Sequence, residues 1–144
     1  RVLAAPEAPL VMAGDQKPSY DADDMKVMLT TCGRLKAVGK SLPESKIDGE
    51  SIGLMAFRAN GLAAFRSALE TTVPDPEALA LWYHDVISLM SSKLLVNTVL
   101  IKGLWWREID TPQDLAEVRA SFARRELSGH FRHSPSVNAA RVKV

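Results

Sequence analysis

The stretch Ser51-Ile52-Gly53-Leu54-Met55-Ala56-Phe57, followed by a helical pattern over residues 61–71, indicates the fold class. The first segment is a short and almost wholly apolar run, which is typical of a buried strand. Asn60 precedes the second segment as an N-cap. Apolar residues recur on one face of the predicted helix, namely Leu62, Phe65 and Leu69. A strand followed directly by a helix points to an α/β domain.

Upstream of this unit the sequence predicts one more strand and a β-hairpin. Residues 9–15 form a short apolar run that ends in turn-forming residues, so we expect a buried strand. Residues 16–24 are polar and interrupted by Pro18, which predicts a loop, and the aspartates at its end are expected to be solvated. Residues 25–30 and 34–38 then form two strands connected by a turn at Cys32-Gly33.

Downstream, a second helix is predicted from Glu77 to about Ser92. Asp75 is its expected cap and Pro76 its first residue. Its inner face carries an apolar stripe at helical spacing, formed by Leu79, Trp82, Val86, Ile87 and Met90. Two strands follow at residues 94–101 and 105–109, and a last helix begins after Thr111, with Leu115, Val118 and Phe122 on its inner face.

The composition excludes several classes of protein. The 144 residues suffice for one domain with a hydrophobic core. A net charge of +1 gives no electrostatic basis for binding nucleic acid or an anionic membrane. No apolar run approaches the roughly 20 residues that cross a bilayer. Cys32 is the only cysteine and cannot form an internal disulfide, so we expect a reducing, cytoplasmic location.

The segment Trp106-Arg107-Glu108-Ile109-Asp110-Thr111-Pro112-Gln113-Asp114-Leu115 carries the main functional signal. In a strand, Glu108 and Asp110 would point to the same face, because side chains two apart share a face. Ligand sites of open α/β sheets lie at the carboxyl ends of strands. Carboxylate oxygens suit Mg²⁺, so a magnesium site is expected here. From the local residues alone, a solvated strand end and a helix cap are the better interpretation of Glu108 and Asp110.

In these residues and their order, the chain resembles the carboxy-terminal portion of the nucleotidylyltransferases, of the phosphocholine or 2-aminoethylphosphonate cytidylyltransferase type. The resemblance runs from about residue 10 to residue 122 and ends in Glu108-Ile109-Asp110-Thr111-Pro112. The stretches that agree upstream are Asp24-Met25-Lys26-Val27, Val38-Gly39-Lys40, Leu42-Pro43, Gly49-Glu50-Ser51-Ile52-Gly53-Leu54 and Trp82-Tyr83-His84-Asp85.

The resemblance implies a reaction and roles for three residues. A phosphate or phosphonate oxygen of the acceptor would attack the α-phosphorus of CTP and release pyrophosphate. Asp110 would be the second of two aspartates that hold the catalytic Mg²⁺. Glu108 would face the cationic amine of the acceptor, and Lys40 would lie near its phosphate or phosphonate as a point charge.

The resemblance also implies an acceptor pocket. Glu50 would line this pocket, while Trp82 and Tyr83 would offer ring faces to an ammonium group. Other interpretations of the same residues stay open: Lys40 as a surface lysine, Glu50 as an exposed edge acid and Trp82 as a packing residue. Tyr83 lies off the apolar stripe and is the better candidate for an aromatic residue of the site.

The sequence departs from the family in lacking its glycine-rich triphosphate loop and its first metal aspartate. We therefore predict a partial Rossmann-like mixed sheet with flanking helices, without the N-terminal nucleotide-binding βαβ part. Residues 1–126 would be the acceptor-binding part and residues 127–144 a basic, flexible tail. The expected partners are CTP or another nucleoside triphosphate, a small phosphorylated or phosphonate acceptor, and the missing half, without which the chain would be inactive.

Two other functions fit the sequence. One is half of a sugar-1-phosphate nucleotidylyltransferase, against which the aromatic and acidic residues argue weakly because they favour a cationic acceptor. The other is a non-catalytic domain that binds a metabolite. The histidines do not add a metal site, because His84, His130 and His133 are too scattered to form one set of ligands.

Overall fold

The computed structural model describes residues 2–5 and 7–127, which form two compact units divided between Leu104 and Trp105. The first unit holds a five-stranded sheet and two α-helices. Its elements are β1 (Leu10–Asp15), β2 (Lys26–Leu29), β3 (Leu35–Gly39), η1 (Glu44–Lys46), β4 (Gly49–Phe57), α1 (Gly61–Thr72), η2 (Pro76–Ala80), α2 (Tyr83–Met90) and β5 (Val96–Leu100). The second unit holds α3 (Pro112–Leu127). The predicted tail lies outside the described residues, apart from Leu127.

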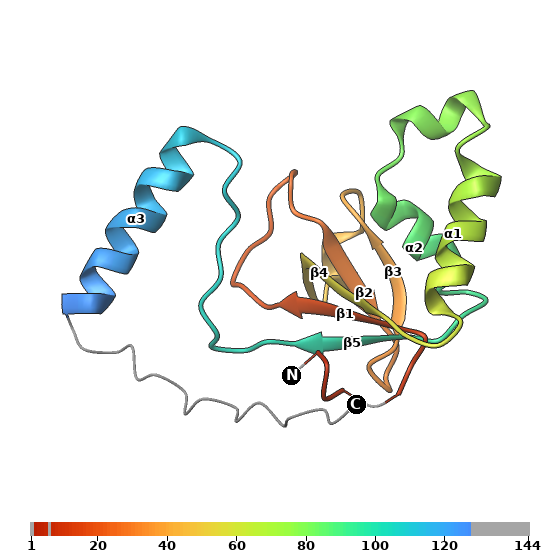
Figure 1. Cartoon of the computed structure of the whole chain (residues 1–144), viewed down its shortest axis with the longest axis horizontal. Helices are drawn as coiled ribbons and strands as arrows, with labels where there is room; N and C mark the ends of the chain where they lie inside the picture. The colour runs from red at the N-terminus through yellow and green to blue at the C-terminus, as the bar shows by residue number, and fades with distance from the viewer. Residues whose placement is uncertain (1, 6, 128–144) are drawn as a thin grey trace, which may run out of the picture. The chain divides into compact units, whose positions relative to one another are not determined.

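The sheet is mixed, with the strand order β3-β2-β4-β1-β5, as Figure 1 shows. β1 pairs antiparallel with β4, from Leu10 opposite Phe57 to Asp15 opposite Glu50. On its other side β1 runs parallel to β5. This arrangement confirms the α/β fold class and the mixed sheet with flanking helices that the sequence predicts.

The core forms where the two helices of the first unit pack on the sheet. α2 buries Val86, Ile87 and Met90 against the strands, as the stripe predicts. α1 contributes Phe65 and Leu69, whereas Leu62 is 63% exposed and does not join the core, contrary to the prediction. The strands contribute Leu10, Met12, Val27, Leu35, Val38 and Val96. Burial of these side chains is the main force that holds helices and sheet together.

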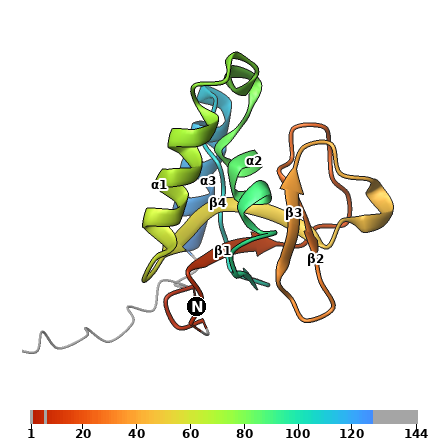
Figure 2. The ribbon, with the colours of Figure 1, turned by 90° about the vertical axis from the view of Figure 1, so that its right-hand side faces the viewer.

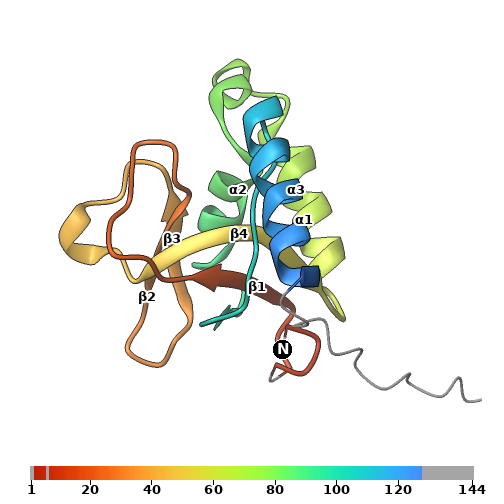
Figure 3. The same ribbon diagram turned by 90° about the vertical axis from the view of Figure 1, so that its left-hand side faces the viewer.

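The predicted hairpin is confirmed as β2 and β3. Gly33 makes the turn with φ +77°, a left-handed conformation that glycine adopts without steric cost. Figures 2 and 3 show the hairpin crossing β1 and β4 steeply, with the loop between β1 and β2 running alongside it. This loop therefore lies close to the end of β3, which matters for the site.

The predicted helix over residues 77–92 is confirmed only from Tyr83 to Met90, because the chain breaks it at Leu81. Residues 76–80 form the 3-10 helix η2, capped by Asp75, whose side chain accepts from the N–H of Glu77. Leu81 and Trp82 are extended, and α2 begins only after Trp82, whose N–H donates to Asp85 Oδ2 at 2.7 Å. The break takes Trp82 out of the apolar stripe and leaves it 55% exposed.

The predicted strand at residues 105–109 is also wrong, since these residues have no regular structure and no strand of the described chain pairs with them. Gly103, with φ +74°, turns the chain soon after β5 ends. The shared strand face expected for Glu108 and Asp110 is therefore absent. Trp105 instead packs edge-to-face on Phe122 of α3, with ring centroids 5.2 Å apart.

The start of α1 provides a test of this packing. A Cβ added at Gly61 would collide with the backbone carbonyl of Pro9, which cannot move without displacing the start of β1. We expect Gly61→Ala to lower the free energy of unfolding by about 1–3 kcal/mol. Urea unfolding followed by circular dichroism measures this loss. Gly39→Ala is the control, because the nearest atom to its Cβ is 3.7 Å away; equal losses for the two variants would contradict the assignment.

Candidate acceptor site

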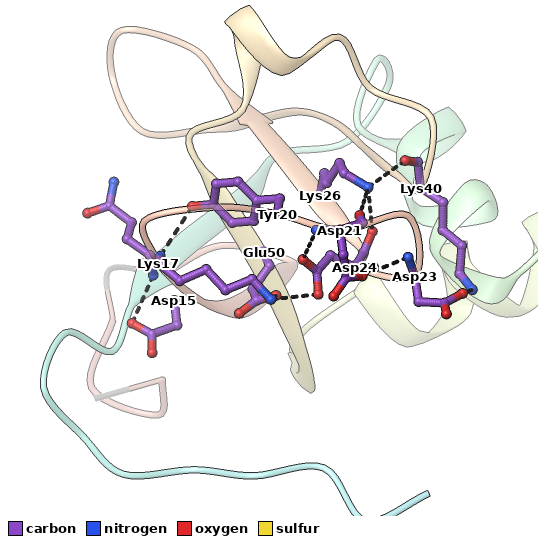
Figure 4. Close-up of polar contacts among 10 residues, drawn as sticks. Asp15, Lys17, Tyr20, Asp21, Asp23, Asp24, Lys26, Lys40 and Glu50 are labelled. Carbon is purple, nitrogen blue, oxygen red and sulfur yellow. Dashed lines mark hydrogen bonds and ion pairs between the residues drawn. The ribbon is translucent and has the colours of Figure 1, made fainter.

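All five strands have an end at one edge of the sheet, and the ends of four of them carry a group of charged residues, drawn in Figure 4. β1 and β3 end there, and β2 and β4 begin there. We call this group the charged edge; it consists of Lys17, Asp24, Lys26, Lys40 and Glu50. The charged edge lies where ligand sites of α/β sheets occur.

Lys17 connects two carboxylates that come from different parts of the chain. Its Nζ lies 2.6 Å from Asp24 Oδ1 and 2.8 Å from Glu50 Oε2. The Glu50 side chain is only 7% exposed and that of Asp24 13%, whereas Lys17 is 34% exposed. These carboxylates are thus largely removed from water, where an ion pair is weakened less by solvent than on an open surface.

The two carboxylates respond differently to the shared ammonium group. Burial raises the pKa of Glu50 above its ordinary value, and the contact with Lys17 only partly offsets this. Burial also acts to raise the pKa of Asp24, but hydrogen bonds from Lys17 and from the Asp21 N–H outweigh it and lower the pKa. Burial acts to lower the pKa of Lys17, yet its two carboxylate partners raise it.

Lys26 is buried at the beginning of β2 and holds the surrounding loops together. Its Nζ donates to the backbone carbonyl oxygens of Asp21, Asp24 and Lys40. The three carbonyl oxygens take up its three donors, as a buried ammonium group requires. Lys26 therefore joins the loop after β1 to the end of the hairpin.

Lys40 and Trp82 meet beside this network. Lys40 Nζ lies 4.6 Å from the centroid of the Trp82 ring, within the range of a cation–π interaction. The same ammonium group is 3.2 Å from Asp23 Oδ1, whose side chain is 97% exposed, so this ion pair is worth little. The ring face of Trp82 is thus in contact with an ammonium group of the chain itself.

A buried hydrogen bond ties the charged edge to α2. His84 Nε2 lies 3.1 Å from Ser51 Oγ, and both residues are about 95% buried. The Nδ1 atom of His84 has no hydrogen-bond partner in the described part of the chain. Burial lowers the pKa of His84 to about 4, so the ring is neutral at pH 7. Tyr83 stacks on this ring with centroids 3.9 Å apart, and its hydroxyl faces β4 near Gly53.

Asp110 precedes α3 in the second unit, and the helix cap is made by its neighbours. The Thr111 N–H and hydroxyl donate to Asp114 Oδ2, each at 2.7 Å, and the Asp114 N–H donates to Thr111 Oγ1 at 3.2 Å. Asp110 contributes only its backbone N–H, at 3.2 Å from Asp114 Oδ2. Its carboxylate is therefore not used by the cap, and Asp110 and Glu108 are both exposed.

The predicted site residues thus fall into three places. The structure brings Lys40 and Trp82 into contact and puts Glu50 in the adjoining ion network, whereas Tyr83 lies against His84 and β4. Glu108 and Asp110 belong to the second unit. The packing role considered for Trp82 does not hold, because the ring is exposed.

Sequence reasoning missed Lys17, Asp24 and Lys26. The aspartates at residues 21–24 were expected to be solvated, which holds for Asp23 but not for Asp24. One signal was available: Lys26 stands at an inward-facing end of a strand next to an acidic run, where a lysine needs acceptors. No comparable pattern marks Lys17, whose partners depend on the fold.

The described residues contain no group of three or more histidine, cysteine, aspartate or glutamate side chains able to hold a metal ion. Mg²⁺ needs only one or two protein carboxylates when phosphate oxygens and water complete its shell. An uncommitted Asp110 carboxylate is compatible with such a site, although it supplies a single ligand.

Two transferases are among the solved structures that resemble this chain. The inositol-1-phosphate CTP transferase from T. maritima matches 84% of this chain and 47% of its own, with a TM-score of 0.61 and 14% identity. A CMP:2-keto-3-deoxy-manno-octonic acid synthetase, solved in complex with CTP, matches 86% and 53%, with a TM-score of 0.59 and 18% identity. This chain therefore has the fold of part of these CTP-using transferases and spans about half the length of each.

No protein-family model and no curated protein matches the sequence. In the described part of the chain, no helix has both the length and the apolar character that crossing a membrane needs.

Removing the shared ammonium group tests the charged edge. We expect Lys17→Met to lower stability at pH 7 by about 1–2 kcal/mol, because two buried carboxylates lose their cation. The contribution of Lys17 is present at neutral pH and is lost as pH rises above its ordinary pKa of 10.5; that of Asp24 is lost as pH falls below 3.8. Glu50 acts in the opposite sense, because its raised pKa favours the protonated native form.

Chemical unfolding at pH 7 measures this loss. The matched control is Arg66→Met, which removes an exposed ion pair with Glu70 and should cost about 0.5 kcal/mol or less. A Lys17→Met variant as stable as the Arg66→Met variant would show that the charged edge does not depend on Lys17.

The buried histidine predicts an acid-sensitive fold. A pKa lowered from 6.5 to about 4 stabilises the native state above pH 6.5, and this stability is lost as pH falls toward 4. The expected loss is about 3 kcal/mol over that range. His84→Gln should flatten the dependence, and NMR titration of the His84 ring should give a pKa well below 6.5. A ring that titrates at its ordinary value would contradict the burial of His84.

Proposed function

We propose that this chain is the acceptor-binding part of a nucleotidyltransferase. The whole enzyme would transfer a cytidylyl group from CTP to a small phosphorylated or phosphonate amine, such as phosphocholine or 2-aminoethylphosphonate, and release pyrophosphate. The observation that carries the proposal is the contact between Lys40 of the charged edge and the ring of Trp82. The likeness of the fold to two transferases whose names include CTP or CMP supports the nucleotide.

The acceptor would take up the cation site on Trp82. An ammonium group already rests on this ring face, so the face suits the cationic amine of the acceptor. Lys40 would then turn from the ring to the phosphate or phosphonate group of the same molecule and orient its attacking oxygen. Its weak pairing with exposed Asp23 leaves it free to do so.

Glu50 and Tyr83 would complete the acceptor pocket. Glu50 shares the ammonium group of Lys17 with Asp24, so Glu50 would form a fixed polar wall of the pocket. The Ser51–His84 hydrogen bond connects Glu50's strand to the helix that begins with Tyr83. Glu50 and Tyr83 would therefore stay at a constant distance from each other while the acceptor binds.

The second unit contains Glu108 and Asp110, whose proposed roles follow from the resemblance. Asp110 would hold Mg²⁺, which when bound neutralises charge on the phosphate groups of CTP. Its free carboxylate supports this role. Glu108 would face the amine of the acceptor. A second carboxylate and the triphosphate-binding loop would come from a nucleotide-holding part, because no glycine-rich phosphate-binding stretch occurs in this sequence.

A second candidate acceptor is a sugar or polyol derivative. The two similar structures are named for an inositol phosphate and for a keto sugar acid, neither of which is an amine. In that case the ring of Trp82 would pack on the carbon face of the ligand, and the contact with Lys40 would persist.

Titration calorimetry of this chain with phosphocholine, 2-aminoethylphosphonate and glucose-1-phosphate tests the proposal. We expect one of the two amines to bind best, and Trp82→Ala to weaken its binding about 2- to 30-fold, the range of a cation–π contact. Lys40→Ala should weaken binding of all three, because each carries a phosphate or phosphonate. Leu79→Ala, at an 86% exposed position of η2, is the control.

Other outcomes of these titrations would support a different function. Preferential binding of glucose-1-phosphate would favour the sugar acceptor, and binding of none would leave a non-catalytic domain for a different metabolite. CTP-dependent release of pyrophosphate by this chain alone would refute the claim that the nucleotide site lies outside it.

A further inference from the structure

One edge of β4 is largely unpaired. β1 pairs along one side of this strand, but on the other side β2 reaches only Gly49 and Glu50, and the Ser51 N–H bonds to Met25. No strand in the described part of the chain pairs with that side of residues 52–57. Figures 2 and 3 show β4 continuing past the hairpin toward α1. We call residues 52–57 on this side the open edge.

The open edge is irregular over residues 52–54, where the register with β1 shifts and Gly53 has φ +73°, but it has no charged residue or proline to keep another strand from pairing. Its sequence, Ile-Gly-Leu-Met-Ala-Phe, contains no charged residue and no proline. Soluble proteins normally protect exposed edges with such residues or cover them. Leu54 on the open edge is 54% exposed. A segment that covers this edge would therefore supply hydrogen-bond partners for its unpaired backbone N–H and C=O groups.

An apolar hollow of about 470 Å³ lies next to the open edge. It is lined by Gly53, Met55, Phe57, Phe65, Leu69 and Tyr83. Met55 and Phe57 lie two residues apart in the regular part of β4 and so share one face. A strand added beside β4 would place every second side chain over this hollow, which gives the occupant a defined pattern.

We infer that the open edge binds a β-strand of the nucleotide-holding part of the enzyme. The inference rests on the proposed function. The similar structures match most of this chain with only about half of their own length, so comparable folds hold as much polypeptide again. The partner segment is extended, pairs its backbone with residues 52–57, and carries apolar side chains at alternate positions that fill the hollow.

Site-specific photo-crosslinking in cells that naturally produce the protein tests this. A benzophenone amino acid replaces Leu54, and the control carries it at Leu79, which is 86% exposed and far from any strand end in sequence. We expect a crosslink from position 54, absent from position 79, to a polypeptide segment that retains CTP on its own or belongs to a part of the same chain that does.

A charge in the hollow provides the second variant. Met55→Lys should reduce the yield of the position-54 crosslink by about tenfold or more, because docking would bury the ammonium group. Leu79→Lys should leave the yield unchanged. Circular dichroism of both variants checks that they fold; if Met55→Lys unfolds, Met55→Gln replaces it.

Two results would overturn the inference: a crosslink only to a second copy of residues 52–57, or no crosslink specific to position 54. These are separable from failure of the proposed function. A crosslink to the CTP-binding part with no pyrophosphate release would sink the reaction and keep the docking edge. Pyrophosphate release by the chain together with its CTP-binding part, but without the crosslink, would support the reaction and exclude the docking edge.

Discussion

The close approach of β1 and β4 at two glycines governs the geometry of the charged edge. A Cβ at Gly14 would lie 2.8 Å from the Glu50 carbonyl oxygen, and a Cβ at Gly49 would lie 2.7 Å from that of Asp15. Side chains at either position would push the strands apart. Because the strands touch here, Glu50 lies opposite Asp15 at the end of β1. Lys17, two residues further along the chain, is therefore within reach of Glu50.

The electrostatics of the cluster follow from this contact. Two carboxylates share one ammonium group, yet Asp24 also accepts a backbone N–H from Asp21, while Glu50 is the deeper of the two. Their pKa values therefore move in opposite directions. Burial therefore favours the protonated form of Glu50, whereas the hydrogen bonds to Asp24 favour its carboxylate.

Much of the fold could be predicted from the sequence, because apolar runs and turn residues mark β1, the hairpin, β4 and α1 directly. The break before α2 could not, since Leu79 and Trp82 fit the stripe of Val86 and Met90 in spacing while the backbone at Leu81 is extended. The strand expected at residues 105–109 has suitable residues but no pairing partner, and pairing is a property of the fold.

The site could be predicted from the sequence less completely than the fold. Lys40, Glu50 and Trp82 were found through the resemblance, and the structure gives the contact between Lys40 and Trp82 that spacing alone could not. The role of Lys17 could not be predicted, because its partners lie 7 and 33 residues away along the chain and no local pattern encodes that distance. Long-range ion pairs of this kind depend on the pairing of β1 with β4.

The same strand links the charged edge to the open edge. β4 begins with Glu50 inside the ion network, passes Ser51 and its bond to His84, and then runs unpaired on one side from Ile52 to Phe57. An unpaired stretch of backbone opens more readily than one held on both sides. A strand bound there would therefore stiffen β4 and, through it, the position of Glu50.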